Sequence, residues 1–475
     1  MNAMTALCKG CALLVLLGGL AGCATVDFDQ SVARTNTQAA GFTHGQLALA
    51  RDAAQRDAMA LRASELLSRP LSEPAAVQLA LANSPSFQAL LARNWASSAD
   101  AAQSGRLANP VFSFERFHVL DEVEFGRLLS IGLLDLLTFP VRQGVAKSRV
   151  AAEEHRLTRD VVRQVTEVRG AWVRALAANE RLGYARQVFT AAEASAELAR
   201  RMQQVGNFNT IERVRQQGFY ADAATQLALA RHEATARQEE LIRQLGLTES
   251  QVPLLMLPAR LPDLPESARQ PEDVSSAARD GNLDVRLAQA EFEAAAKAQG
   301  LGRVTSLVDV EAGLRRNTIF DNDSGDRATG RGYELDVTLP LFDWGGMKRE
   351  AMNARTLAAG HELEAALRGS GSRLREGYSA YRTAHDIARH YREEIIPLQQ
   401  VMAEENVYRY NAMLIGVFEL LADARERIRV VQAGIDALEE FWRADAALEA
   451  VIMGTGGGGE LAGPAPQGEA GDAGH

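Results

Sequence analysis

The sequence predicts an α+β membrane protein in which long antiparallel helical hairpins accompany a few amphipathic strands. From Arg331 towards Met352, apolar and polar side chains alternate strictly as far as Pro340. This alternation is typical of a strand with one apolar and one polar face. No proline occurs between Val141 and Gln251, and apolar residues recur there every three or four positions, which indicates long helices. Both patterns occur in each half of the chain.

The first residues resemble a bacterial export signal of the lipoprotein type. Cys11–Leu20 is an apolar core whose length suits a signal peptide rather than a membrane-spanning helix. It runs into Leu20-Ala21-Gly22-Cys23, which resembles a lipobox. We therefore expect removal of residues 1–22 and covalent lipid on Cys23, with no other cofactor. Because Ala24 rather than aspartate follows, we expect the outer membrane; a plain secretory signal with a chance cysteine is the alternative.

Composition argues against several classes of function. The chain has 51 Lys and Arg against 61 Asp and Glu, so its net charge of −10 disfavours a nucleic-acid partner. No apolar run is long enough for a transmembrane helix. His232-Glu233 and His361-Glu362 lack the second histidine of a zinc protease motif. We expect His385 and His390 to be solvated, and we predict no metal site and no enzymatic activity.

The chain repeats one plan, with Pro85, Phe139 and Glu212 corresponding to Leu283, Phe342 and Glu419. We expect a signal peptide at 1–22, followed by a lipid anchor and linker at 23–46. The first structural repeat is expected at 47–251, with strands at 111–139 and a long hairpin at 141–245. A proline-rich linker at 252–272 leads to the second repeat at 273–452, with strands at 308–342 and a long hairpin at 344–452, and a disordered tail follows at 453–475.

The predicted strands pose a closure problem. Four amphipathic strands cannot close a barrel, and an open strand edge cannot lie in lipid. The strands must therefore close with strands from other copies of the chain. In the first strand Phe112 and Phe114 share a face, but Phe117 and Val119 are out of phase with them, which a bulge or an earlier strand end could explain.

On these features the chain resembles the TolC-like outer-membrane factor family, in its lipoprotein branch. The resemblance covers residues 47–452. It rests on the lipobox, the doubled plan, the segment Leu339–Gly346 and the pair Arg409-Tyr410. It implies a homotrimer with a 12-stranded transmembrane β-barrel and a trimeric α-barrel of helical hairpins. Such a trimer is the passive exit duct of a tripartite efflux or secretion system, spanning outer membrane and periplasm.

The resemblance also implies partners and a gate. The partners are a periplasmic adaptor protein, an inner-membrane transporter and outer-membrane lipid. Gate candidates at the periplasmic tips are Glu212, Tyr410 and Glu419, although Ile415 and Ala422 stand where some relatives carry a gate arginine and a further acidic residue. A glutamate in the first turn of a helix also suits the helix dipole, which is an alternative role for both glutamates.

Acidic residues on the polar strand faces are candidates for the barrel lumen: Asp309, Glu311, Glu334 and Asp336. A ring of carboxylates would favour cations, although ordinary solvation of the lumen is an equal alternative.

Two other functions remain open at this stage. One is a structural or adhesive coiled-coil envelope lipoprotein, and the other is a periplasmic adaptor subunit. Neither accounts for two matching pairs of membrane strands together with two long hairpins. The sequence leaves the exported substrate and the class of inner-membrane pump open.

Overall fold

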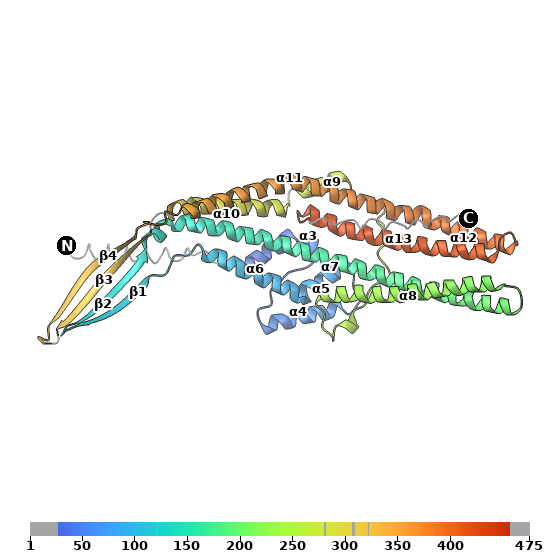
Figure 1. Cartoon of the computed structure of the whole chain (residues 1–475), viewed down its shortest axis with the longest axis horizontal. Coiled ribbons are helices and arrows are strands. Elements are labelled where there is room, and N and C mark those ends of the chain that lie inside the picture. Colours follow the sequence, from blue (N-terminus) through green and yellow to red (C-terminus); the bar gives the residue numbers. More distant parts are fainter. Residues whose placement is uncertain (1–26, 121, 280–281, 306–308, 322, 457–475) are drawn as a thin grey trace. The chain divides into compact units, whose positions relative to one another are not determined.

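The computed structural model describes residues 27–120, 122–279, 282–305, 309–321 and 323–456. Figure 1 labels the helices and strands of the chain, which divides into two compact units. The first, which we call the sheet unit, comprises Met1–Ser31, Arg93–Leu157 and Val285–Arg368. The second, the helical unit, comprises Val32–Ala92, Thr158–Asp284 and Gly369–His475. The predicted signal peptide, Cys23 and residues 457–475 of the predicted tail lie outside the described residues.

Helices account for most of the chain. In order they are α2 (Phe28–Gln38), α3 (Ala40–Thr43), α4 (Ala53–Leu66), α5 (Glu73–Asn83), α6 (Pro85–Gln103), α7 (Leu133–Gln204), α8 (Thr210–Leu245), η2 (Val252–Leu254), α9 (Pro271–Arg279), α10 (Leu283–Thr305), α11 (Gly346–His390), η3 (Tyr391–Ile395), α12 (Ile396–Asn411) and α13 (Val417–Ile452).

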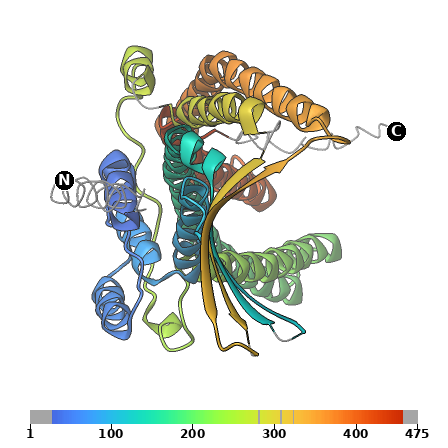
Figure 2. The ribbon, with the colours of Figure 1, turned by 90° about the vertical axis from the view of Figure 1, so that its left-hand side faces the viewer.

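The described residues of the sheet unit include one antiparallel sheet of four strands in the order β1-β2-β3-β4 (Figure 2). The strands are β1 (Val111–Val119), β2 (Glu122–Gly132), β3 (Asp309–Asp321) and β4 (Arg327–Thr338). β1 pairs with β2 without interruption from Val111↔Ser130 to Val119↔Glu122, so no bulge is present there. Phe117 and Val119 therefore point to the face opposite Phe112, and their phase needs no other explanation.

The strands predicted at 111–139 are wrong at their C-terminal end. β2 stops at Gly132, and α7 begins at Leu133 and continues through Pro140. The leucines after Gly132 follow no alternation, so periodicity alone does not separate strand from helix there. Asp135 lies in the first turn, where a carboxylate favours a helix start, and it pairs with Arg142.

The connection between the two strands predicted within 308–342 is short. The polar composition of residues 317–330 is typical of a loop, but β3 continues to Asp321 and β4 begins at Arg327. Most of that polar segment is therefore strand. The exposed tip of a hairpin tolerates polar residues on both faces, which hides the strand from a search for alternation.

Both predicted hairpins are present. α7 and α8 are joined at residues 205–209, and α12 and α13 are joined at residues 412–416. The apolar residues that recur every three or four positions along α7 form a buried seam, in which Val161, Val165 and Val168 are fully inaccessible and Trp172 is 3% exposed. The helix continues past Pro397, which follows a π-turn at Tyr391–Ile395 in which the backbone N–H of Ile396 donates to the carbonyl of Tyr391.

Within the helical unit, two glycines lie where the end of a hairpin meets the start of another helix. Gly246 and Gly454 follow α8 and α13 with φ angles of +66° and +81°. A Cβ on Gly246 would lie 2.6 Å from Cα of Ser84, and one on Gly454 would lie 2.5 Å from the backbone nitrogen of Leu283. Each hairpin therefore ends directly against the start of another helix, α6 in the first repeat and α10 in the second.

Residues 27–46, predicted as part of an extended linker, are largely helical. α2 and α3 occupy most of this segment, and Phe42 is 4% exposed. In the helical unit, Arg169 lies 4.5 Å from the Phe42 ring centroid. The segment is polar on average, but its few aromatic side chains provide enough apolar area to pack.

Candidate functional site

The register gives the sheet two chemically different faces. The predicted lumen residues lie together on one of them, since Glu311 is opposite Asp336 and Gly313 is opposite Glu334. Asp309 is on the same face, two residues before Glu311 in β3. The structure therefore brings Asp309, Glu311, Glu334 and Asp336 to a common surface, which we call the acidic face.

The acidic face carries a basic residue that the sequence analysis missed. Arg315 forms ion pairs with Glu334 at 3.1 Å and with Glu115 at 3.4 Å, linking β3 to two other strands. Beside it, Asn317 donates a hydrogen bond of 2.6 Å to Glu124. The alternation that selected Asp309 and Glu311 continues through Gly313 to Arg315, so the signal was available in the sequence.

The opposite face, which we call the apolar face, carries Tyr333, Leu335 and Val337 on β4. These side chains are 89%, 59% and 46% exposed. An exposed apolar surface of this kind marks contact with lipid or with another protein.

At the turn of the first hairpin, Glu212 has a defined local role. The Asn209 side chain accepts a hydrogen bond of 2.9 Å from the Glu212 backbone, and the Glu212 carboxylate accepts one of 2.7 Å from the Asn209 backbone. This is a capping box, which satisfies backbone donors at the start of α8.

The second turn is built differently. Gly416 precedes α13 and provides no side-chain cap, and Met413 in the turn has a φ of +61°. Glu419 is exposed in the first turn of α13, and Tyr410 near the end of α12 is 38% exposed. Within the described part of the chain, neither side chain forms a hydrogen bond or an ion pair. The corresponding glutamates of the two repeats therefore differ: Glu212 caps its helix and Glu419 faces solvent.

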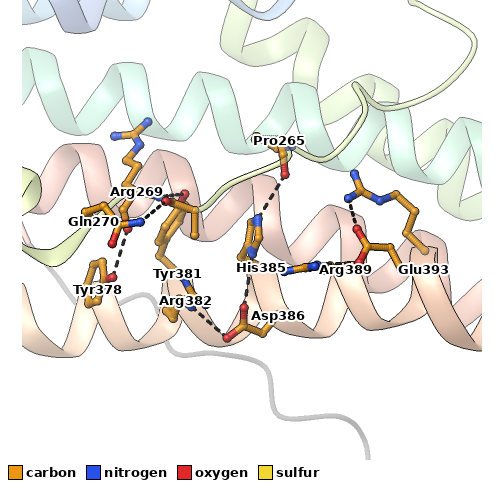
Figure 3. Close-up of polar contacts among 12 residues, drawn as sticks. Pro265, Arg269, Gln270, Tyr378, Tyr381, Arg382, His385, Asp386, Arg389 and Glu393 are labelled. Atoms are coloured by element: carbon orange, nitrogen blue, oxygen red, sulfur yellow. Dashed lines mark hydrogen bonds and ion pairs between the residues drawn. The ribbon is translucent and has the colours of Figure 1, made fainter.

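In the helical unit, the proline-rich linker is fastened along α11 (Figure 3). Tyr378 donates a hydrogen bond of 3.1 Å to the carbonyl of Arg269, and the backbone of Arg269 donates one of 3.1 Å to the Tyr381 hydroxyl. His385 lies 3.3 Å from the carbonyl oxygen of Pro265. The prediction that His385 is solvated is wrong, because its side chain is 2% exposed and packs against Phe441.

A buried charge cluster lies beside this linker. Arg169 is 4% exposed and forms ion pairs with Glu73, at 2.8 Å, and with Glu449. It also donates a hydrogen bond of 2.7 Å to the carbonyl of Phe42. Arg269 forms ion pairs with Asp445 at 3.0 Å and Glu449 at 2.7 Å. Sequence reasoning missed this cluster because its members come from distant segments.

The pKa values of the carboxyl groups in the cluster are shifted in different directions. Burial raises the pKa of Asp445 from 3.8 to about 6, although Arg269 partly opposes this. Burial also raises the pKa of Glu73, against the effect of Arg169. Burial alone would raise the pKa of Glu449, but the guanidinium groups of Arg169 and Arg269 outweigh it and lower that pKa. Asp445 is therefore the carboxyl group whose burial is offset least by the neighbouring arginines.

Among the described residues, no group of three or more His, Cys, Asp or Glu side chains is placed to hold a metal ion. None of the helices in the described ranges combines the length and hydropathy needed to cross a membrane.

Comparison with solved structures reveals several proteins of the same architecture. A membrane protein from Pseudomonas aeruginosa matches with a TM-score of 0.67 and 17% identity over 82% of this chain and 93% of its own. The outer membrane protein VceC from Vibrio cholerae gives 0.66 and 14% over 83% and 96%. The CmeC outer membrane channel of Campylobacter jejuni gives 0.68 and 13% over 83% and 86%.

The chain has the fold of these outer-membrane channels. The predicted resemblance to the TolC-like family is thus confirmed at the level of the fold. No protein-family model and no curated protein sequence matches the chain.

Proposed function

We propose that this chain is a subunit of an outer-membrane channel that serves as the exit duct of a tripartite efflux or secretion system. The observation that carries the proposal is the likeness of fold to outer-membrane channels such as VceC and CmeC, which extends over 83% of the chain. The two-faced sheet supports it, because one face suits lipid and the other suits a water-filled lumen. The two alternatives, an adhesive coiled-coil lipoprotein and a periplasmic adaptor, do not account for such a sheet.

The proposed assembly is a homotrimer with a 12-stranded β-barrel. β1 and β4 are the outer strands of the sheet, and each has one edge that pairs with no other strand of the described residues. Such edges cannot remain open in lipid, so they pair with the edges of two further copies. The long hairpins then form the periplasmic α-barrel, and Cys23 anchors each chain to the outer membrane by lipid. A periplasmic adaptor and an inner-membrane transporter complete the system.

The direct test is fractionation of envelopes, followed by electrophoresis in mild detergent and recording in planar bilayers. We expect the protein in the outer-membrane fraction, as an SDS-resistant trimer that forms ion channels. Recovery as a soluble monomer, or a purified trimer with no conductance, contradicts the proposal. The Cys23→Ser variant should lose lipid labelling while its trimer still conducts, because strands rather than lipid span the membrane.

We further propose that Tyr410 and Glu419 contribute to a gate at the hairpin tips. Symmetry repeats Glu419 three times around the axis, and its exposed carboxylate has no partner to neutralise it within the described part of the chain. Tyr410→Phe should raise the opening frequency, and Glu419→Gln should weaken cation preference. Glu212→Gln is a matched control for local structure, because it weakens the capping box at the other tip. If Glu419→Gln and the parent share the same ion selectivity, this glutamate does not line the constriction.

A further inference from the structure

The apolar face of the sheet carries a band of arginines at the end nearer the strand turns. Arg127 lies opposite Arg316, and Arg316 lies opposite Arg331, so three adjacent strands present a guanidinium at the same level. Arg116 lies opposite Phe125 and Arg327 lies opposite Phe320, both closer to the turns and on the same face. We call these residues the arginine band: Arg116, Arg127, Arg316, Arg327 and Arg331.

Aromatic rings are interleaved with the band. The guanidinium of Arg116 lies 5.7 Å from the ring centroid of Phe125, and that of Arg327 lies 5.4 Å from the ring centroid of Phe320. The rings of Phe125 and Phe320 are themselves in edge-to-face contact at 5.8 Å. Cation and aromatic ring therefore share one surface, as at a membrane interface.

The carboxylates of the described strands are confined to one face of the sheet. The acidic side chains of β1 to β4 all lie on the acidic face: Glu115, Glu122, Glu124, Asp309, Glu311, Asp321, Glu334 and Asp336. Among the described residues, no member of the arginine band forms an ion pair with a carboxylate. Like charges directly opposite each other on neighbouring strands repel, so anions from outside the chain would stabilise this row.

The level of the band fits the boundary of a membrane. On β4 and just beyond it, Tyr333, Leu335, Val337 and Leu339 form an apolar run, and Arg331 is the next side chain on that face. From Leu339 to Arg331 there are eight residues, which at ~3.4 Å each and a tilt of about 40° span about 21 Å. This is close to the height of ~25 Å of the apolar band on outer-membrane barrels.

We propose that the arginine band binds the phosphate groups of an anionic glycolipid of the lipid A type in the outer leaflet. This inference rests on the membrane placement in the proposed function, in which the helices are periplasmic and the strand turns face the cell exterior. Guanidinium groups bind phosphate oxygens in a bidentate manner and with charge assistance. The apolar rows below the band lie where the acyl chains of the same lipid would run.

The test uses the purified full-length protein in nanodiscs of phosphatidylethanolamine with a minor share of bis-phosphorylated lipid A. A parallel set contains the same lipid A with its phosphates removed. Lipid retained after extraction into mild detergent is measured by mass spectrometry. We expect several-fold enrichment of phosphorylated lipid A over its bulk share, and none of the dephosphorylated form. The triple variant Arg127→Gln, Arg316→Gln, Arg331→Gln should return the ratio to the bulk value.

The control is Arg315→Gln, which removes the neighbouring arginine of β3 on the acidic face. It loses two ion pairs, yet it should retain phosphorylated lipid A as the parent does. If the triple variant does not insert, the single variant Arg316→Gln replaces it and should lose part of the enrichment. Excess inorganic phosphate should not displace the lipid; complete displacement would show a general anion site and overturn the proposal.

Channel conductance and SDS resistance are recorded on the same samples. A conducting trimer that does not enrich phosphorylated lipid A refutes the inference but leaves the proposed duct intact. A parent protein that neither conducts nor forms a trimer refutes the proposed duct instead.

Discussion

Replacing Arg169 by methionine should destabilise the helical unit more than any surface substitution. Arg169 is 4% exposed and contacts Glu73, Glu449 and the carbonyl of Phe42. Methionine keeps most of the volume but leaves carboxylates without their partner. Breaking a buried ion pair from one side costs about 3–5 kcal/mol. Glu449 keeps its ion pair with Arg269 at 2.7 Å, so most of the cost falls on Glu73.

The same reasoning predicts the pH dependence of this loss. Burial already raises the pKa of Glu73, and removal of Arg169 takes away the charge that opposes the rise. A carboxyl whose pKa is higher in the folded state costs stability while it is ionised, and the cost falls as pH drops through the folded pKa. Arg169→Met should therefore be less destabilising at pH 5 than at pH 8.

The measurement is the midpoint of guanidinium unfolding followed by circular dichroism, at both pH values. The control is Arg200→Met, because Arg200 is 57% exposed and pairs only with the surface residue Glu197 among the described residues. Exposed pairs of this kind contribute little, so the control should match the parent. Equal midpoints for the two variants, or an Arg169→Met loss that does not change with pH, would refute the role assigned to the cluster.

Three further predictions follow from local geometry. Gly246→Ala and Gly454→Ala should each destabilise the folded protein by more than the ~1–2 kcal/mol that a left-handed backbone costs, because the new Cβ also clashes with backbone atoms at 2.5–2.6 Å. The control in the same unfolding assay is Gly206→Ala, because Gly206 has a φ of +82° but no neighbouring atom that a Cβ would meet. Asp445→Asn should stabilise by up to roughly 3 kcal/mol at pH 7.5, because its pKa of about 6 exceeds 3.8; the gain should vanish near pH 4, and a gain that persists there contradicts the assignment. Val337→Arg should cost about 2–4 kcal/mol if the residue lies at the bilayer midplane, whereas Thr338→Arg on the other face should assemble normally; equal loss of SDS-resistant trimer from both would mean that the faces are misassigned.

Local patterns predicted much of the fold because they depend on near neighbours. Alternation in β4 placed Glu334 and Asp336 on one face, and the structure agrees. Spacing in α7 predicted the buried seam from Val161 to Trp172. Where local patterns were ambiguous the prediction failed, as in the leucine-rich segment after Gly132, which reads equally well as strand and helix.

Sequence alone could not reveal the roles that depend on distant partners. Arg169 looked like one polar residue on a long helix, yet Glu73 and Glu449 approach it from opposite ends of the chain. His385 looked solvated because nothing nearby in the sequence indicated that the linker at Pro265 would cover it. For Glu212 and Glu419 the sequence offered gate and helix-start roles to both, and the structure assigns a capping box to Glu212 alone.

The arginine band is a third kind of feature. The sequence shows which residues are arginines and which face each one lies on, but not that arginines of neighbouring strands lie opposite one another. A side chain's face follows from alternation within one strand, whereas its level depends on pairing between strands. β1 and β2 are only two residues apart in the sequence, but β2 and β3 are separated by the whole first hairpin and the linker. A shift of one residue in that pairing would exchange the faces of β3, and a shift of two would separate Arg127 from Arg316. If one face must stay apolar, a shift of one residue is excluded, because it would move polar side chains onto that face. A shift of two residues is permitted, because every side chain would keep its face. The apolar pattern alone therefore does not explain why three arginines lie opposite one another, and we attach a binding role to this alignment for that reason.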